Sequence, residues 1–202
     1  MISSSTLLAV AIASGLTVAV AVAAPDARAA RWSLGTNYGF AVHNPDKGRN
    51  STAFDWPGSA FGFQPGMRLG VTGGSRFSEG YLDLGMFFLD EAVGSRRDLQ
   101  ASLNYQRNLS PQSTTTLYFT AGGGLVHRGD DSGTASVSAT SGTFGGGVGV
   151  RNEISNGFGS LRVEARVDRV LEASDRGAVV IEPAVVYALK VGFDLWLFDE
   201  DD

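Results

Sequence analysis

Eight stretches of the chain alternate strictly between apolar residues and polar or small ones, and this period of two limits the fold more than any other feature. Successive side chains of a β-strand point to opposite faces, so each stretch predicts a strand with one apolar face. An even number of such strands, long enough to cross a bilayer at a tilt, predicts an all-β, antiparallel, up-and-down transmembrane barrel. The expected strands cover residues 32–43, 61–72, 79–88, 98–106, 117–125, 144–151, 161–168 and 181–197.

The connections between these strands also alternate. Long loops are expected at 43–59 and 127–141, and intermediate ones at 90–95 and 172–178. Short turns are expected at 73–76, 108–113 and 155–157. Longer loops at one end and shorter turns at the other are typical of an outer-membrane barrel. Pro65 and Pro183 lie inside expected strands, where a missing N–H predicts a local bulge.

Composition helps to decide which face points inward. The less apolar face is built mainly from glycine, alanine, serine, asparagine and glutamine, and the whole chain has 27 glycines. A face in water is usually rich in Lys and Glu, whereas small residues suit the crowded interior of an eight-stranded barrel. The apolar face is therefore expected toward lipid. A soluble lipocalin-like carrier, with the apolar face inside, is the alternative.

Charge and cysteine content exclude several classes of protein. Sixteen Lys and Arg against 21 Asp and Glu give a net charge of −5 without a basic cluster, which argues against a nucleic-acid binder. The absence of cysteine excludes disulfides and thiolate metal sites. No cofactor and no metal site are expected.

The two ends of the chain are predicted to lie outside the barrel. Residues 7–24 are apolar and uncharged, and Ala27-Arg28-Ala29 fits a signal-peptidase site. Residues 1–29 are therefore expected to be a cleaved signal peptide, with an uncleaved membrane anchor as the alternative. The barrel would then cover residues 30–198, followed by an acidic tail at 199–202 on the periplasmic side.

The last strand carries a polar residue, a glycine and spaced hydrophobics: Lys190, Gly192, Leu195 and Leu197. This pattern is similar to the C-terminal signal that outer-membrane proteins present to the barrel-assembly machinery. Residues 30–198 as a whole resemble the OmpA/OmpX-type eight-stranded outer-membrane barrels of Gram-negative bacteria. The resemblance implies a location in the bacterial outer membrane and contact with its lipids. The chain departs from the pattern after Phe198, where four acidic residues follow.

Ten charged residues are expected on the inward face. Arg162, Glu164, Arg166 and Asp168 alternate along one strand, and the other strands add Arg68, Asp83, Arg151, Glu182, Lys190 and Asp194. Buried charges in a narrow lumen must be paired, so a structural salt-bridge network is predicted. The alternative is a gated, charge-lined conduit for small ions. Eight strands leave little space for an open pore, which favours the network.

Two arginines, Arg97 and Arg169, interrupt the lipid-facing pattern near the loop end of the barrel. Guanidinium groups match phosphate geometry, so both are candidate contacts for lipopolysaccharide. The alternative is ordinary snorkelling of the side chains into the headgroup region.

Enzymes that modify lipid A occur on this architecture, so a catalytic role is an alternative. Only His43 and His127 offer a general base, and both lie at the loop-side ends of strands. The alternation along its strand places His43 on the inward face, with Asp46 nearby in sequence and Ser59 as a conceivable nucleophile. The His-x-Ser spacing of deacylases is missing. We therefore expect a monomeric, non-enzymatic barrel with a structural role or with a surface ligand bound by its loops.

Overall fold

The computed structural model describes residues 31–46, 66–73, 75–91, 94–131, 136–154, 158–175 and 178–198. These residues form ten strands. Among them, no helix is long and apolar enough to cross a bilayer. The strands are β1 (Arg31–Pro45), β2 (Gly66–Thr72), β3 (Ser78–Glu91), β4 (Gly94–Asn108), β5 (Thr115–Asp131), β6 (Ser136–Ile154), β7 (Gly159–Val170), β8 (Ala173–Asp175), β9 (Ala178–Ile181) and β10 (Ala184–Phe198).

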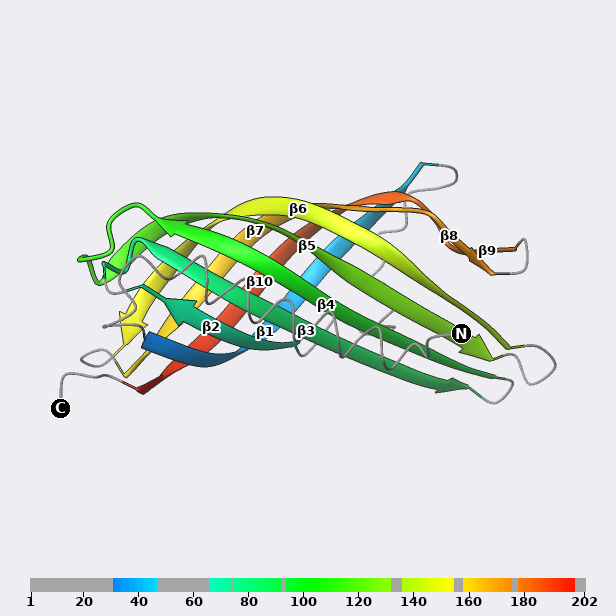
Figure 1. The fold of residues 1–202 in the computed structure, drawn as a ribbon, viewed down its shortest axis with the longest axis horizontal. Helices are drawn as coiled ribbons and strands as arrows, with labels where there is room; N and C mark the ends of the chain where they lie inside the picture. The colour runs from blue at the N-terminus through cyan, green and yellow to red at the C-terminus, as the bar shows by residue number, and fades with distance from the viewer. Residues whose placement is uncertain are drawn as a thin grey trace.

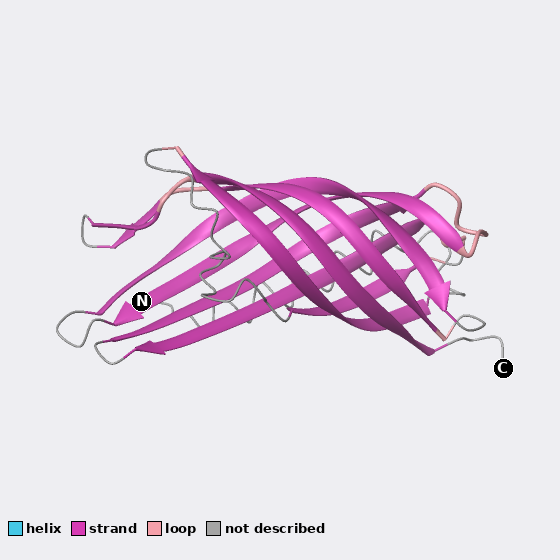
Figure 2. Cartoon of the chain, turned by 180° about the vertical axis from the view of Figure 1, so that it is seen from behind, coloured by secondary structure: helices cyan, strands magenta, loops and turns pink. Residues whose placement is uncertain are grey.

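Eight of these strands close into one antiparallel barrel, in the order β1-β10-β7-β6-β5-β4-β3-β2 (Figures 1 and 2). Each barrel strand pairs with the next barrel strand along the chain, and β1 pairs with β10 to close the sheet. β8 and β9 form a separate two-stranded hairpin between β7 and β10. The predicted eight-stranded up-and-down barrel is therefore confirmed.

The barrel has two unlike ends. At the turn end, short connections join β2 to β3, β4 to β5 and β6 to β7. At the opposite loop end lie the β5–β6 hairpin, the β8–β9 hairpin and the ends of β1 and β3 (Figure 1). On one side of the barrel, β3, β4, β5 and β6 extend past the other barrel strands at the loop end.

The stagger of the strands fixes how wide the barrel is. Register partners, followed from strand to strand once around the sheet, return to β1 ten residues beyond the starting point. The path runs through Gly35, Arg68, Asp83, Ser102, Gly124, Thr143, Val170, Ala184 and Pro45. Such a stagger tilts the strands against the barrel axis, and with eight strands it leaves an interior just wide enough for side chains.

The two faces of the sheet differ as the alternation predicts. Outward side chains such as Leu117, Phe119 and Leu161 are large, apolar and exposed. Inward side chains such as Arg68 and Arg151, each 1% exposed, are polar and buried. An apolar outer face with a polar interior suits a barrel in lipid and is the reverse of a lipocalin-like carrier. In the described strands, the polar side chains are therefore the buried ones.

The β5–β6 hairpin corrects one expectation. Residues 127–141 were expected to be a loop, but β5 continues to Asp131 and β6 begins at Ser136, with paired residues throughout. The two strands have 17 and 19 residues, well beyond the 9–11 or so that cross a bilayer at a tilt. Backbone pairing between adjacent strands needs no alternating side chains, so this Ser-, Thr- and Gly-rich segment continues the ladder.

The last strand corrects a second expectation. Residues 181–197 were expected to be one strand, but Ile181 ends β9 and β10 begins at Ala184. Pro183 lies between them, and its carbonyl accepts a hydrogen bond from the Asp46 N–H at 3.0 Å. A proline has no N–H for the ladder, so the strand breaks there instead of bulging. Pro65 and the expected strand residues 61–64 lie outside the described residues, as do 1–30 and 199–202.

Candidate functional site

Glu79 is the centre of the charge cluster that fills the lumen at the turn end. Its carboxylate accepts hydrogen bonds from Arg68 on β2 and from Arg151 on β6, the latter at 3.2 Å. All three side chains are at most 2% exposed. Arg151 therefore spans the lumen from β6 to β3. The guanidinium of Arg68 also lies over the Tyr81 ring, 3.4 Å from its centroid.

A second ion pair completes the same cluster. Arg162 on β7 donates to Asp194 on β10, with one of the two bonds at 3.0 Å, and to the side-chain oxygen of Asn37 at 2.9 Å. We call Arg68, Glu79, Arg151, Arg162 and Asp194 the turn-side cluster. Its carboxylates are shared between arginines from different strands, so the wall of the barrel is cross-linked through its interior.

Inward glycines provide the space for these large side chains. A Cβ atom at Gly149 would overlap the Tyr118 ring, and one at Gly192 would lie 2.7 Å from the Arg162 guanidinium. The hydroxyl of Tyr118 in turn donates to Glu164 at 3.1 Å. The glycines of the inward face thus make room for the polar network and leave little open volume beside it.

A second group of charges lies further toward the loop end, and we call it the middle cluster: Asp83, Glu164, Arg166, Asp168 and Lys190. Arg166 pairs with Asp168 at 2.8 Å and lies 3.6 Å from Glu164. It also donates to the side-chain oxygen of Asn104 at 2.7 Å. The two clusters together contain five bases and five acids, so their formal charges balance.

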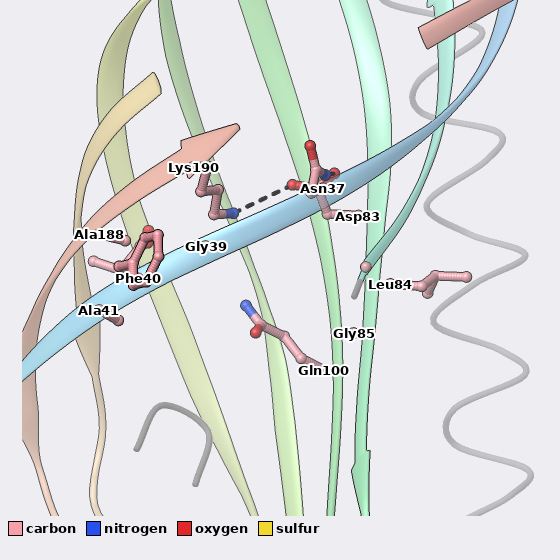
Figure 3. A pocket seen from close by; sticks show the side chains of 12 residues that line it. Asn37, Gly39, Phe40, Ala41, Asp83, Leu84, Gly85, Gln100, Ala188 and Lys190 are labelled. Atoms are coloured by element: carbon pink, nitrogen blue, oxygen red, sulfur yellow. Dashed lines mark hydrogen bonds and ion pairs between the residues drawn. The ribbon is translucent and has the colours of Figure 1, made fainter. Parts of the chain in front are cut away.

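The middle cluster borders a small cavity of about 60 Å³ (Figure 3). Lys190 reaches across it toward Asp83, with the two charged atoms 3.5 Å apart, and Gln100 lines the same space. Gly39 and Gly85 contribute no side chain to the wall. This volume is enough for a few water molecules and too small for an organic ligand.

An apolar layer lies in the lumen beyond the cavity, toward the loop end. It consists of Val126 on β5, Val170 on β7, Val186 on β10 and Ile181 on β9, each at most 2% exposed. Ile181 comes from the β8–β9 hairpin, so this hairpin packs into the lumen. Apolar side chains in a polar lumen disfavour the passage of water and ions. This layer was not predicted, although Val126, Val170 and Val186 occupy inward-facing positions in the alternation of their strands.

The structure brings together nine of the ten charges expected in the lumen. The exception is Glu182, which is exposed and lies between β9 and β10, outside the closed sheet. That expectation was wrong because it treated 181–197 as one strand. The buried charges that were not predicted include Glu79, which lies on the same face of β3 as Tyr81 and Asp83, and also Arg31 and Asp98.

The two candidate lipopolysaccharide contacts differ in their surroundings. Arg97 is exposed on β4, close to the loop end. Arg169 on β7 forms a two-pronged ion pair with Asp46, one bond measuring 2.6 Å, and both partners are partly exposed. Because Arg169 already has a carboxylate partner, the guanidinium of Arg97 is the more available of the two for binding a phosphate.

Of the remaining candidates, only Gly192 borders the lumen network in the described part of the chain. Leu195 and Leu197 have the outward parity of β10, whereas Gly192 faces Asn37 and Arg162 inside. His127 Nδ1 lies 2.9 Å from the Thr140 hydroxyl, while the His43 side chain and Ser59 are outside the described parts. In the described ranges, no three His, Cys, Asp or Glu residues are grouped to hold a metal ion.

No family model matches the chain, and no curated protein matches it in sequence. Solved structures do share its fold. The crystal structure of Neisserial surface protein A is similar with a TM-score of 0.58 at 14% identity, over 82% of this chain and 97% of that one. A major outer membrane protein from Thermus thermophilus is similar with a TM-score of 0.54 at 12% identity, over 83% and 99% of the two chains. The chain therefore has the fold of the eight-stranded outer-membrane β-barrels that its sequence resembles.

Proposed function

We propose that this protein is a non-enzymatic, monomeric barrel of the bacterial outer membrane whose lumen is closed and whose contacts are made by the outer hairpins. The observation that carries the proposal is the filled interior. The turn-side cluster spans the lumen with side chains at most 3% exposed, and the apolar layer lies beyond it. A filled lumen has a structural role and leaves the outer surface for recognition.

The β5–β6 hairpin supports the surface role. Its strands are paired up to Asp131 and Ser136, beyond the length that lipid covers. Its outer part contains polar residues such as Arg128, Ser138 and Thr140. The guanidinium of Arg128 pairs with Asp98 on β4 at 3.0 Å, which ties the projecting part to the neighbouring strand. A hairpin held in this way presents a preformed surface to a ligand outside the cell.

The test is expression of the full chain in a Gram-negative host, with an epitope inserted between residues 131 and 136. We expect recovery in the outer membrane, a change of gel mobility on boiling in detergent, and antibody labelling of intact cells. The same epitope inserted between residues 111 and 112, at the turn end, is the control and should be labelled only after permeabilisation. A soluble product, or labelling of both insertions on intact cells, would overturn the proposal.

A narrow ion conduit is the second candidate, and the cavity beside Lys190 favours it. The 3.5 Å separation between Lys190 and Asp83 is long for an ion pair, and the Lys190 side chain is 23% exposed. Movement of this lysine would enlarge the cavity toward the apolar layer. Single-channel recording in planar bilayers separates the candidates: the closed barrel gives no steps, whereas a conduit gives steps that Lys190→Met alters.

A further inference from the structure

A polar group interrupts the lipid-facing surface at the turn end of β3 and β4. Arg107 on β4 pairs in register with Ser78, the first residue of β3, and lies next to Asn108, the last residue of β4. Its Nη1 donates to the Ser78 hydroxyl at 3.1 Å, and that hydroxyl lies 2.9 Å from the Tyr105 hydroxyl. Three polar side chains from two strands therefore form one connected group on the outside of the barrel.

The charge of Arg107 is not balanced by a carboxylate in the described part of the chain. Its other contact is with the Phe77 ring, 4.9 Å from the centroid. Two other arginines near the surface do have acidic partners: Arg76 lies 3.7 Å from Glu153, and Arg128 pairs with Asp98. An arginine on an apolar membrane surface is costly unless it reaches an anion at the interface. The missing counter-charge is therefore expected from outside the chain.

The surroundings of Arg107 fit a lipid. Leu117 and Phe119 on the neighbouring β5 are 59% and 52% exposed, and Leu109 is 49% exposed. Phe119 is the register partner of Arg107, so an apolar wall begins beside the guanidinium. Aromatic and basic residues at the edge of the apolar band are where a barrel meets lipid headgroups. Acyl chains against this wall would place a phosphate next to Arg107.

We propose that Arg107, together with the hydroxyls of Ser78 and Tyr105, binds the phosphate of a glycerophospholipid in the leaflet at the turn end, the periplasmic side of the membrane. A guanidinium has five N–H donors, and Ser78 accepts from only one nitrogen of Arg107. The other donors are available to phosphate oxygens, which guanidinium groups bind in a forked geometry. This inference rests on the proposed outer-membrane location.

The test is native mass spectrometry of the protein purified from outer membranes of an expressing host. The folded protein in detergent is titrated with phosphatidylglycerol and with diacylglycerol of the same acyl chains. We expect one phosphatidylglycerol retained by the wild type and an apparent affinity about tenfold lower in Arg107→Gln, the usual loss for a charged hydrogen bond. Arg76→Gln removes the same charge at the same end and is the matched control, with unchanged retention. Arg107→Lys should keep part of the affinity.

The outcomes separate this inference from the proposed location. Equal phosphatidylglycerol retention by wild type and Arg107→Gln overturns the phosphate site. Equal retention of diacylglycerol overturns it too, because the surface would then bind acyl chains alone. Loss of bound lipid on adding millimolar inorganic phosphate shows a site for free phosphate and overturns the lipid assignment. Each variant is first checked for heat-modifiable gel mobility. A protein that never reaches the outer membrane contradicts the proposed function instead.

Discussion

Glu79 accepts hydrogen bonds from two arginines that start on opposite sides of the lumen, Arg68 on β2 and Arg151 on β6. A single carboxylate is thereby the hydrogen-bonded counter-charge of two buried guanidinium groups. Removing one partner of a buried ion pair lowers stability by more than the intact pair contributes to it. The reason is that the remaining charge stays buried without a counter-charge. The stability of the interior is therefore most sensitive to its shared acids.

We predict that Glu79→Gln lowers the free energy of unfolding by about 3–5 kcal/mol, because both arginines lose their counter-charge in a buried site. Urea unfolding of the protein in lipid vesicles, followed by gel mobility, measures the change. Glu182→Gln is the matched control. Glu182 is exposed outside the sheet, so its variant should lie within about 0.5 kcal/mol of the wild type. Equal losses in the two variants would contradict the central role of Glu79.

The inward glycines make a second residue-level prediction. Gly149→Ala places a Cβ against the Tyr118 ring, and we expect a loss of about 1–3 kcal/mol from overpacking. Gly129→Ala is the control, because nothing lies within 4 Å of its added Cβ. The same unfolding measurement compares them. A Gly149→Ala variant as stable as Gly129→Ala would show that the ring moves aside freely.

The inward position of a charged residue can be predicted from the alternation along its strand. Arg162, Glu164 and Arg166 were placed inward because they alternate with apolar residues on one strand. The partner of each charge was not predictable, because pairs such as Arg151 with Glu79 join strands that are not neighbours in the sheet. The same alternation places Glu79 on the inward face with Tyr81, so its position was also predictable.

At the scale of elements, alternation predicted the strands of the barrel wall well and their extensions at the loop end poorly. A strand in lipid must separate apolar from polar faces, and this separation produces the period of two. The outer parts of β5 and β6 are rich in Ser, Thr and Gly, so their sequence carries no clear apolar alternation although the ladder continues. The β8–β9 hairpin was missed for a related reason: its apolar residues, ending at Ile181, were read as the start of the next strand.

The β8–β9 hairpin makes the prediction at this scale. Ile181 is 2% exposed and packs in the apolar layer with Val126, Val170 and Val186. Ile181→Ala should lower the free energy of unfolding by about 2–4 kcal/mol, because it leaves a cavity in a closely packed site. Leu171→Ala, at a position 45% exposed, should change it by less than about 0.5 kcal/mol. Similar values for the two would mean that Ile181 adds no packing energy to the apolar layer.

For the whole molecule, the position of the charges decides how the protein responds to salt. The lumen pairs are buried, whereas Arg169 and Asp46 at the loop end are partly exposed. Dissolved ions screen exposed charges and hardly affect buried ones. We predict that the temperature at which gel mobility changes stays within about 3 °C between 0.1 and 1 M NaCl, since only weak surface pairs are screened. A steep fall with salt would place the stabilising pairs on the surface.

The interior network also sets a condition on how the barrel is made. Arg151 and Glu79 are 72 residues apart, Lys190 and Asp83 are 107 apart, and Arg162 and Asn37 are 125 apart. Each partner meets the other only when the sheet has curled around far enough for opposite walls to face one another. A chain inserted one hairpin at a time would expose unpaired arginines and carboxylates to hydrocarbon. We therefore expect curling and membrane entry to occur together. The charges of the lumen are all paired only once the barrel has closed.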